Sequence, residues 1–386
     1  MNEPTVFDVE TTGATNGTKG NPFSRHNRLV LGGFHYLDGT FHSFTETQTV
    51  EAFRNKRSSF LVGVNIKFDL HWLSRYMDVA ALFPISIWDC QYAQYCIWRQ
   101  QVPWISLDDC LKAYGFPLKL DVVKTEYWDK GIDTDQVPFD ILWDYLKGDL
   151  ERTKWVYQSQ LNYLADRPDL YKLILMGMED ILTTFLMENN GIRYDYEGSI
   201  QGGTEKLKRI EEIDQLLNDL VCSPTAINWA SNAHISAVLF GGVVKEKYRE
   251  RYQLELKSGQ IKEKERWSIR EVPFPALMKP LKGTETKHKG VYQVGEDVLI
   301  KLSTKGTKKT KKIIDLLLER TKLETAVSRY YFGLPQLMDQ MNWGQKYLYG
   351  NLNHAITKTG RIASNKPNRQ NFPEDIGQYC ISRFSV

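Results

Sequence analysis

The chain has 386 residues, more than one ordinary hydrophobic core accommodates, and this length predicts two or three domains. Apolar residues make up 42% of the chain and charged residues 25%, which is typical of a globular protein. The net charge of only +3 excludes a strong overall field that would steer the chain to nucleic acid, so any nucleic-acid surface must be local.

Cysteine usage and hydropathy indicate the compartment. Five cysteines are scattered without a Cys-x-x-Cys pair or a nearby His-x-x-x-His: Cys90, Cys96, Cys110, Cys222 and Cys380. This irregular set predicts reduced thiols rather than disulfides or a zinc site. No apolar run approaches the ~18 residues of a membrane span, and we expect no signal peptide before Asp8, because the first predicted strand begins at once. We expect a cytoplasmic protein, in the host-cell cytoplasm if the chain is viral.

The first part of the chain alternates short apolar stretches with helical patterns. Strands are predicted over residues 4–9, 28–36, 40–44 and 59–64. The turn Asp38-Gly39 joins the second and third strands. Helices are predicted over about 67–76, 91–99, 107–114 and 139–164. Acidic residues at strand ends and on a late helix suit a mixed α/β layer fold.

The character of the sequence changes after Asp166-Arg167-Pro168. Helices are predicted over 170–189 and 203–220, and the helix stop Asn189-Asn190-Gly191 indicates a domain boundary between them. Residues 241–310 are polar and punctuated by Gly and Pro, which predicts an extended, partly stranded excursion before a helix over 313–331. The expected domains are residues 1–190, residues 191–350 with a polar insertion at about 243–310, and residues 351–386.

Three acidic motifs point to one chemistry. Asp8-x-Glu10 ends the first apolar stretch, Asn65-Ile66-Lys67-Phe68-Asp69 follows the fourth strand, and Tyr145-x-x-x-Asp149 lies on the long helix. Two residues apart on a strand, or four apart on a helix, side chains share a face. Hydrolysis of a phosphodiester needs an activated water and a stabilised leaving oxygen, which two Mg²⁺ ions about 3.5–4 Å apart supply. Mg²⁺ prefers oxygen ligands, so a few carboxylates suffice.

Each motif also has a plain structural explanation. An isolated Asp-x-Glu is usually a solvated surface pair. Asn65 could cap the helix that carries Asp69, and Tyr145 could be a half-buried residue with a hydrated hydroxyl. Asp144 competes with Asp149 for the ligand position. The order of the three motifs along the chain favours a nuclease over these explanations.

At these residues the chain resembles the DEDD exonuclease superfamily in its tyrosine-containing branch, over about residues 1–190. The resemblance implies a ribonuclease-H-like fold and 3′–5′ exonuclease activity. It implies four ligands for two Mg²⁺ ions, which Mn²⁺ can replace: Asp8, Glu10, Asp69 and Asp149. Tyr145 would orient the attacking water and Asn65 would help to place the substrate. Many relatives carry a leucine wedge where this chain has Ala14, in a glycine-rich loop, so the terminal base would rely on other residues.

A second resemblance lies near the C-terminus. The segment Thr357-Lys358-Thr359-Gly360-Arg361-Ile362-Ala363-Ser364-Asn365-Lys366-Pro367-Asn368-Arg369-Gln370-Asn371-Phe372-Pro373 is similar to the segment that opens the palm of family A DNA polymerases. Gly360 allows a tight turn, and Arg361, Gln370 and Asn371 offer donors that suit minor-groove acceptors shared by all base pairs. By the resemblance, these three residues would contact the minor groove of the primer–template.

The region between the two resembles a polymerase thumb. Met187–Ile192 matches the Met-Glu-x-x-Gly-Ile motif of the family, and residues 228–241 and 315–331 resemble further thumb segments. Six lysines and no acid occur in Lys301–Lys312. Among them Lys305, Lys308 and Lys309 are expected to bind duplex phosphates, with salt-dependent affinity, although such a run can also be a solvated loop.

The palm carboxylate motif Asp-Tyr-Ser-Gln-x-Glu, the nucleotide-binding Arg/Lys helix and the final His-Asp-Glu of the family do not occur in the sequence. We therefore expect an α/β, ribonuclease-H-like mixed-sheet exonuclease domain, a mainly helical thumb and a palm fragment. The favoured hypothesis is the proofreading and DNA-gripping subunit of a split, phage-type family A polymerase, with palm and fingers on a second chain. The alternatives are a free-standing 3′–5′ exonuclease and a non-catalytic DNA-binding subunit.

Overall fold

The computed structural model describes residues 3–55, 59–79, 85–118, 121–223, 225–255 and 261–382. The chain forms two compact units. The first unit comprises Met1–Tyr196 and Leu334–Val386, and the second unit comprises Glu197–Gly333. These limits differ from the expected boundaries at 190 and 350. The reason is strand pairing, because β6 (Ile192–Tyr194) lies between β9 (Tyr347–Leu348) and β12 (Cys380–Ile381) in one antiparallel sheet.

The first unit is built on a five-stranded mixed sheet. Its strands are β1 (Pro4–Thr11), β2 (Leu29–His35), β3 (Phe41–Thr45), β4 (Phe60–Gly63) and β5 (Ser86–Asp89), in the order β3-β2-β1-β4-β5. β2 is antiparallel to β1 and β3, whereas β4 is parallel to β1 and β5. The carboxyl ends of β1, β4 and β5 therefore meet at one edge of the sheet. The prediction of a mixed-sheet α/β fold is confirmed, although β5 was not predicted.

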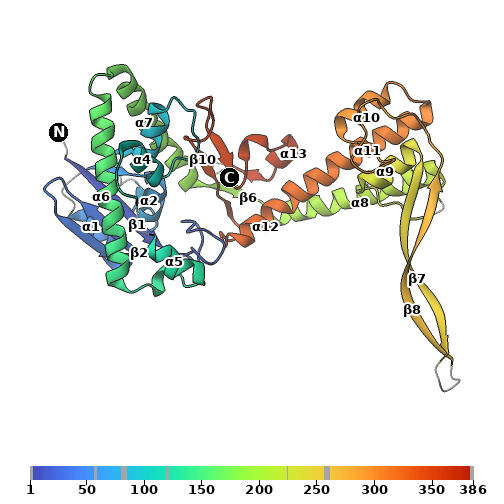
Figure 1. Ribbon diagram of the computed structural model, residues 1–386, viewed down its shortest axis with the longest axis horizontal. Helices are drawn as coiled ribbons and strands as arrows, with labels where there is room; N and C mark the ends of the chain where they lie inside the picture. Colours follow the sequence, from blue (N-terminus) through green and yellow to red (C-terminus); the bar gives the residue numbers. More distant parts are fainter. Residues whose placement is uncertain are drawn as a thin grey trace. The chain divides into compact units, whose positions relative to one another are not determined.

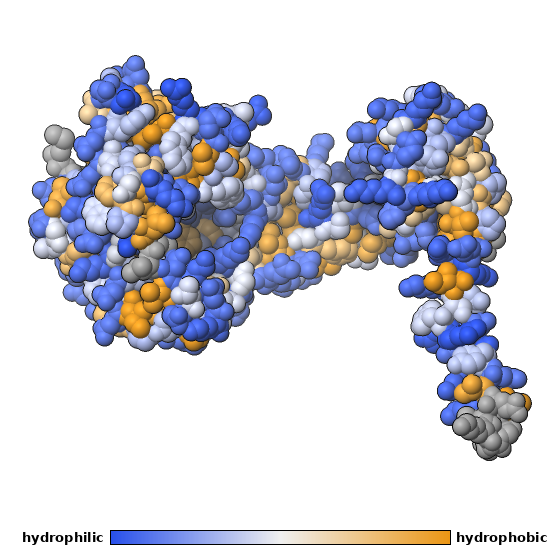
Figure 2. Space-filling view, in the orientation of Figure 1, coloured by the Kyte–Doolittle hydropathy of each residue, from blue (hydrophilic) through white to orange (hydrophobic). Residues whose placement is uncertain are grey.

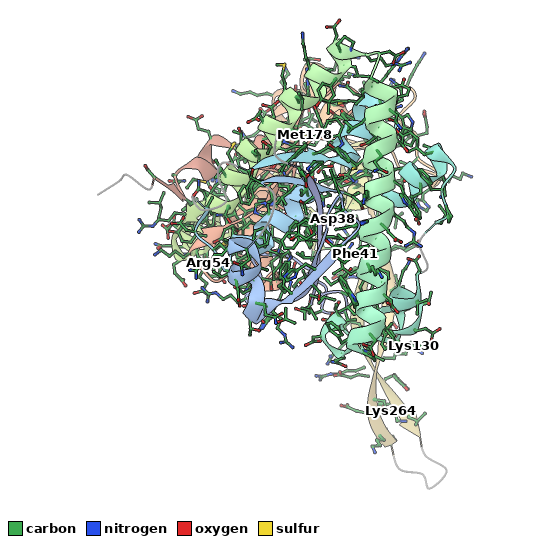
Figure 3. All side chains as sticks on the ribbon, turned by 90° about the vertical axis from the view of Figure 1, so that its left-hand side faces the viewer. Asp38, Phe41, Arg54, Lys130, Met178 and Lys264 are labelled. Carbon is green, nitrogen blue, oxygen red and sulfur yellow. The ribbon has the colours of Figure 1, made fainter. Side chains whose placement is uncertain are left out.

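Helices cover both faces of this sheet (Figure 1). They are α1 (Thr49–Arg54), α2 (Ile66–Leu73), α3 (Cys90–Ile97), α4 (Leu107–Tyr114), α5 (Val122–Glu126), α6 (Phe139–Leu164) and α7 (Pro168–Asn190). On one face, a Cβ at Gly33 would meet Leu146 and Leu150 of α6. Figure 3 shows α6 running across this face. On the other face, stacked and edge-on rings gather from the strands and α1: Phe7, Phe34, Phe44 and Phe53.

The C-terminal segment packs within the first unit. It contains α12 (Gly333–Gln340), the hairpin β10 (Asn351–Asn353) and β11 (Ala363–Asn365), a 3₁₀ turn at Arg369–Asn371, and α13 (Glu374–Gly377). The ring of Tyr349 stacks on Phe23 with centroids 4.2 Å apart. The indole Nε1 of Trp343 donates to Asn21 Oδ1 at 3.0 Å. The expected palm fragment, residues 351–386, thus belongs to the same compact unit as the five-stranded sheet.

The second unit is helical apart from one long ribbon. Its helices are α8 (Tyr196–Val221), α9 (Asn232–Phe240), α10 (Glu296–Ser303) and α11 (Lys308–Ala326), which a π turn (Val327–Tyr331) continues. β7 (Gly242–Glu255) and β8 (Ile261–Phe274) pair in antiparallel register along their whole length. The expected stranded excursion is therefore a ribbon that projects from the helices (Figure 1).

Candidate active site and nucleic-acid interface

Asp8 and Glu10 lie on the face of β1 that α6 covers. Asp8 pairs with Gly33 of β2, and Glu10 pairs with Leu31. Residues directly opposite in an antiparallel pair point to the same face, and the face at Gly33 is the one that carries Leu146 and Leu150. Asp8 is half-buried and Glu10 is buried. The two carboxylates therefore share a face, as their spacing predicts.

Asp69 joins this pair from α2. The backbone N–H of Val9 donates to Asp69 Oδ1 at 3.3 Å and to Asp8 Oδ1 at 2.9 Å, so the two carboxylates meet at one amide. Asp69 is only 2% exposed. Burial, and then the charge of Asp8, raise the pKa of the Asp69 carboxyl well above its usual range. A bound cation would relieve this cost, because an opposite charge favours the ionised carboxylate.

Tyr145 and Asp149 come from α6, which packs against β1 and β2. Asp149 is buried, whereas its competitor Asp144 is exposed, so burial favours Asp149 as the inward carboxylate. The ring of Tyr145 is half-buried and packs edge-on against Trp128, with centroids 6.1 Å apart. Trp128 is held by its Nε1, which donates to Thr134 Oγ1 at 3.1 Å.

The loop after Glu10 fixes the segment that leads into α6. The amides of Gly13 and Ala14 donate to the carboxylate of Asp133 at 3.0 and 3.2 Å. Arg28 pairs with Asp135 at 2.8 Å. Ala14 itself is exposed. Sequence reasoning did not identify Asp133 or Asp135, because contacts between residues 107 to 120 positions apart leave no local pattern.

The four expected ligands have the chemistry that Mg²⁺ prefers, but their side chains are not grouped around one point. All four expected ligands are carboxylates, the donors that Mg²⁺ prefers. Asp8 and Asp69 meet, and Asp149 projects from the covering helix. In the described part of the chain, however, no three or more His, Cys, Asp or Glu side chains are grouped so that they could hold a metal ion. Of the four expected ligands, the structure thus joins Asp8 and Asp69 at one amide, and Asp149 is buried on the helix that packs against β1.

Asn65 occupies the N-cap position of α2, as the structural explanation expected, but its side chain makes no capping hydrogen bond. Asp89, at the end of β5, accepts hydrogen bonds from the amides of Asn65 and Ile66 at 3.3 and 3.0 Å. Asn65 has left-handed backbone (φ 55°), which asparagine tolerates. Its exposed side chain lines a pocket of about 140 Å³ with Tyr92 and Trp104. Sequence reasoning missed Asp89, although an aspartate directly after an apolar stretch is a common N-cap.

A buried ionic cluster fastens α2 to β10. Glu188 of α7 accepts from Lys67 Nζ at 2.8 Å, contacts His71 Nε2 at 2.7 Å and accepts from the amide of Leu352. Burial alone would raise the pKa of Glu188, but the hydrogen bond of His71 and the charge of Lys67 outweigh it and lower the pKa. Lys67 and His71 flank Asp69 on α2, so the helix that carries Asp69 is anchored to the C-terminal segment. Sequence reasoning missed this cluster.

The expected minor-groove residues lie on the surface of the first unit. Gly360 has left-handed backbone (φ 72°) and closes a turn in which its amide donates to Thr357 O at 3.3 Å. Arg361, Gln370 and Asn371 are all exposed. The amide Nε2 of Gln370 donates to Ile362 O at 2.9 Å, which brings Gln370 beside Arg361.

The expected phosphate-binding lysines gather where α11 begins. Lys305 lies in the turn before the helix, Lys308 and Lys309 open it, and all three are exposed. Lysines in the first turn add to the positive end of the helix dipole, a combination that attracts anions. Lys305 also lines a hollow of about 800 Å³, together with Lys279 and Lys282.

The sequence of this chain is similar to those of known DNA polymerases. The family model for DNA polymerase family A matches residues 268–383. The DNA polymerase of Bacillus phage SP01 is 23% identical over 352 residues, which cover 83% of this chain and 35% of that protein. DNA polymerase I of Synechocystis is 24% identical over 325 residues, which cover 80% of this chain and 26% of that protein. The chain is therefore homologous to family A DNA polymerases and spans about a third or less of these relatives.

A solved structure agrees with this fold. The POL domain of Pol1 from M. smegmatis, in complex with DNA primer-template and dNTP, aligns with a TM-score of 0.63 and 17% identity. The alignment covers 98% of this chain and 54% of that one. In the part of this chain that the structure describes, none of the helices has the length and apolarity to span a membrane.

Proposed function

We propose that this chain is the proofreading 3′–5′ exonuclease and DNA-holding part of a family A DNA polymerase. The observation that carries the proposal is the meeting of Asp8 and Asp69 at the amide of Val9, on a sheet edge over which α6 carries Tyr145 and Asp149. Two acidic side chains that meet in this way, with further carboxylates on the same strand and on the covering helix, suit the removal of 3′-terminal nucleotides by metal-assisted hydrolysis. Homology to family A polymerases supports DNA as the substrate.

The chain's own residues would divide the work of hydrolysis. The four carboxylates would hold two Mg²⁺ or Mn²⁺ ions, which when bound lower the pKa of water and stabilise the leaving 3′-oxygen. The phenol of Tyr145, steadied by Trp128, would orient the attacking water. Asn65, exposed beside its pocket, would hold the nucleotide strand near the scissile bond. With these roles, the first unit would be an exonuclease domain of the ribonuclease-H-like fold.

The remaining surfaces would hold the primer–template. Arg361, Gln370 and Asn371 would donate to the minor groove, where acceptors are common to all base pairs. The lysines at the start of α11 would bind phosphates of the duplex. The buried cluster at Glu188 supports a joint role for the two activities, because it ties the helix of Asp69 to the strand that leads toward Arg361.

The polymerase palm and fingers would be supplied by a second chain. Co-purification tests this step. A palm-bearing polypeptide from the same source should bind the chain and restore nucleotide incorporation. If no such polypeptide binds, and exonuclease activity alone accounts for the protein, the free-standing exonuclease is the better description.

Nucleotide release from a 5′-labelled single strand tests the nuclease itself. With Mg²⁺ or Mn²⁺ the label should pass through a ladder of products shortened from the 3′ end, and EDTA should stop the reaction. If wild-type protein binds the strand but releases nothing with either metal, the proposal fails and the non-catalytic DNA-binding subunit is favoured. Parallel DNA and RNA substrates establish which strand is preferred.

A further inference from the structure

The β7–β8 ribbon is an arm that projects from the helices of the second unit (Figure 1). Fourteen residues in each strand, at about 3.4 Å per residue, give a length of roughly 45 Å. Only its base is anchored, through the buried side chains of Val244 and Phe274. Figure 2 shows the rest as a narrow, mostly hydrophilic projection. No motif of the sequence and no part of the proposed function accounts for it.

The two faces of the arm differ in charge. Because side chains alternate along a strand, even-numbered residues of both strands share one face, here named the even face, and odd-numbered residues share the other, the odd face. The even face carries Lys262, Lys264, Arg266 and Arg270 against only two acids, Glu246 and Glu250. Among the described side chains, the odd face carries four Lys/Arg (Lys245, Lys247, Arg249, Arg251) and three Glu (Glu263, Glu265, Glu271), so its excess of positive charge is smaller.

The excess charge of the even face lies on its far half. Arg270 pairs with Glu246 at 2.6 Å and Arg266 pairs with Glu250 at 2.8 Å, so both acids of this face are engaged, each nearer the base than Lys262 and Lys264. Farther out, Lys264 lies opposite Tyr252 and Lys262 opposite Leu254. Neither lysine pairs with a carboxylate among the described side chains. Figure 3 places Lys264 on this outer stretch.

At the base of the arm, the even-numbered side chains are the ones that pack against the helices. Val244 and Val272 belong to the even face and pack against the helical core at the base. The unit from which the arm projects is itself basic, with 25 Lys/Arg and 18 Asp/Glu in residues 197–333, whereas residues 1–196 carry 19 and 26. A polyanion attracted to this unit would therefore come within reach of the arm.

From these observations we infer that the even face of the arm binds the phosphate backbone of duplex DNA through Lys262 and Lys264. The inference rests on the proposed function, since the duplex is the one that the second unit would hold. Duplex DNA carries one phosphate about every 3.4 Å of each strand, so two lysines that lie two residues apart on one strand of the ribbon can contact phosphates of one DNA strand. The contacts are to phosphate, so binding at the arm is independent of base sequence.

Fluorescence anisotropy of a labelled 3′-recessed duplex, with the full chain in EDTA, tests the inference. Each lost phosphate contact flattens the slope of log K against log salt by about 0.9 and costs roughly eightfold in affinity at 0.1 M salt. Lys262→Gln/Lys264→Gln should therefore weaken binding by about 10- to 60-fold and flatten the slope by about 2. The matched control, Lys245→Gln/Lys247→Gln, makes the same charge change two residues apart on the odd face and should leave affinity within about twofold.

Three outcomes would overturn the inference: unchanged affinity in Lys262→Gln/Lys264→Gln, an equal loss in both double variants, or a loss only in the control. If duplex binding is unchanged but the variant binds a palm-bearing chain less tightly, the arm docks protein. Hydrolysis of a short single strand by the same variants separates this inference from the nuclease proposal. If Lys262→Gln/Lys264→Gln hydrolyses the strand normally and binds the duplex with unchanged affinity, only the inference about the arm is refuted. If this variant loses duplex affinity but the wild-type protein hydrolyses no strand, only the nuclease proposal is refuted.

Discussion

Replacing Asp69 by asparagine should make the metal-free protein more stable while removing its nuclease activity. Asp8 Oδ1 and Asp69 Oδ1 lie 2.9 and 3.3 Å from the same amide nitrogen, so these two oxygens are no more than about 6 Å apart. Two unit charges at ~6 Å repel by about 3 kcal/mol at an effective dielectric constant of ~20. Because Asp8 is half-exposed, solvent reduces this to about 1–2 kcal/mol. Asparagine keeps an acceptor for the amide of Val9 and removes the repulsion.

The sign of the pH dependence follows from the raised pKa of Asp69. The folded state holds the Asp69 proton more tightly than the unfolded chain does, so wild-type stability falls as pH rises from the usual carboxyl pKa through the raised one. Asp69→Asn lacks this fall. We expect the variant to gain its advantage above about pH 4 and to keep it at pH 7.

Thermal unfolding in EDTA and in Mg²⁺ measures the effect. In EDTA at pH 7, Asp69→Asn should melt a few degrees above wild type, at roughly 2–4 °C per kcal/mol. Mg²⁺ should stabilise wild type, because it binds only the folded state, and should leave the variant nearly unchanged. A variant that melts below wild type in EDTA would refute the reasoning. The Asp69 carboxylate would then be stabilised by a partner in the metal-free protein, instead of being destabilised by burial and by Asp8.

Three further substitutions follow from the site. Tyr145→Phe should slow hydrolysis by roughly 100-fold and Asp149→Ala by about tenfold more, because the phenol positions water whereas the carboxylate holds metal; equal Mg²⁺ affinity of wild type and Asp149→Ala in calorimetry would contradict this. Glu188→Gln should lower the free energy of unfolding by about 3 kcal/mol, since it strands a buried lysine, while the exposed Glu179→Gln on the same helix should not; equal denaturation midpoints would argue against an ionic cluster. Arg361→Ala should weaken primer–template binding by about 1–3 kcal/mol, the contribution of a charged hydrogen bond. A change of less than twofold in the dissociation constant measured by anisotropy would show that Arg361 does not contact the DNA.

Local patterns predicted the elements that carry the site. The helix over 139–164 was predicted with the bounds that the structure has, because its 26 residues keep one apolar face. The first strand was predicted from its apolar run, although it continues to Thr11 and so includes Glu10. The mixed-sheet fold was inferred from the same short stretches.

Long-range pairings escaped prediction. Glu188 and Lys67 are 121 residues apart, and β6 pairs with β9 about 150 residues later, so neither leaves a periodic signal. These contacts place residues 334–386 in the first unit, whereas residues 334–350 were expected in the thumb-like domain and residues 351–386 as a separate palm segment. β5, a strand of four residues, is too short for its alternation to stand out. The acidic motifs named candidate ligands, but burial was needed to favour Asp149 over Asp144.

The most direct measurement is the rate at which nucleotides leave the 3′ end of a single-stranded DNA in Mg²⁺. Wild type is compared with Asp8→Ala/Glu10→Ala and with the exposed neighbour Asp144→Asn. We predict that the double variant loses at least ~10³-fold in rate, because it removes ligands of the metal pair, and that Asp144→Asn retains wild-type activity. A double variant with near-normal, Mg²⁺-dependent release would contradict the account, because the sheet edge at Asp8 would then not be the nuclease site.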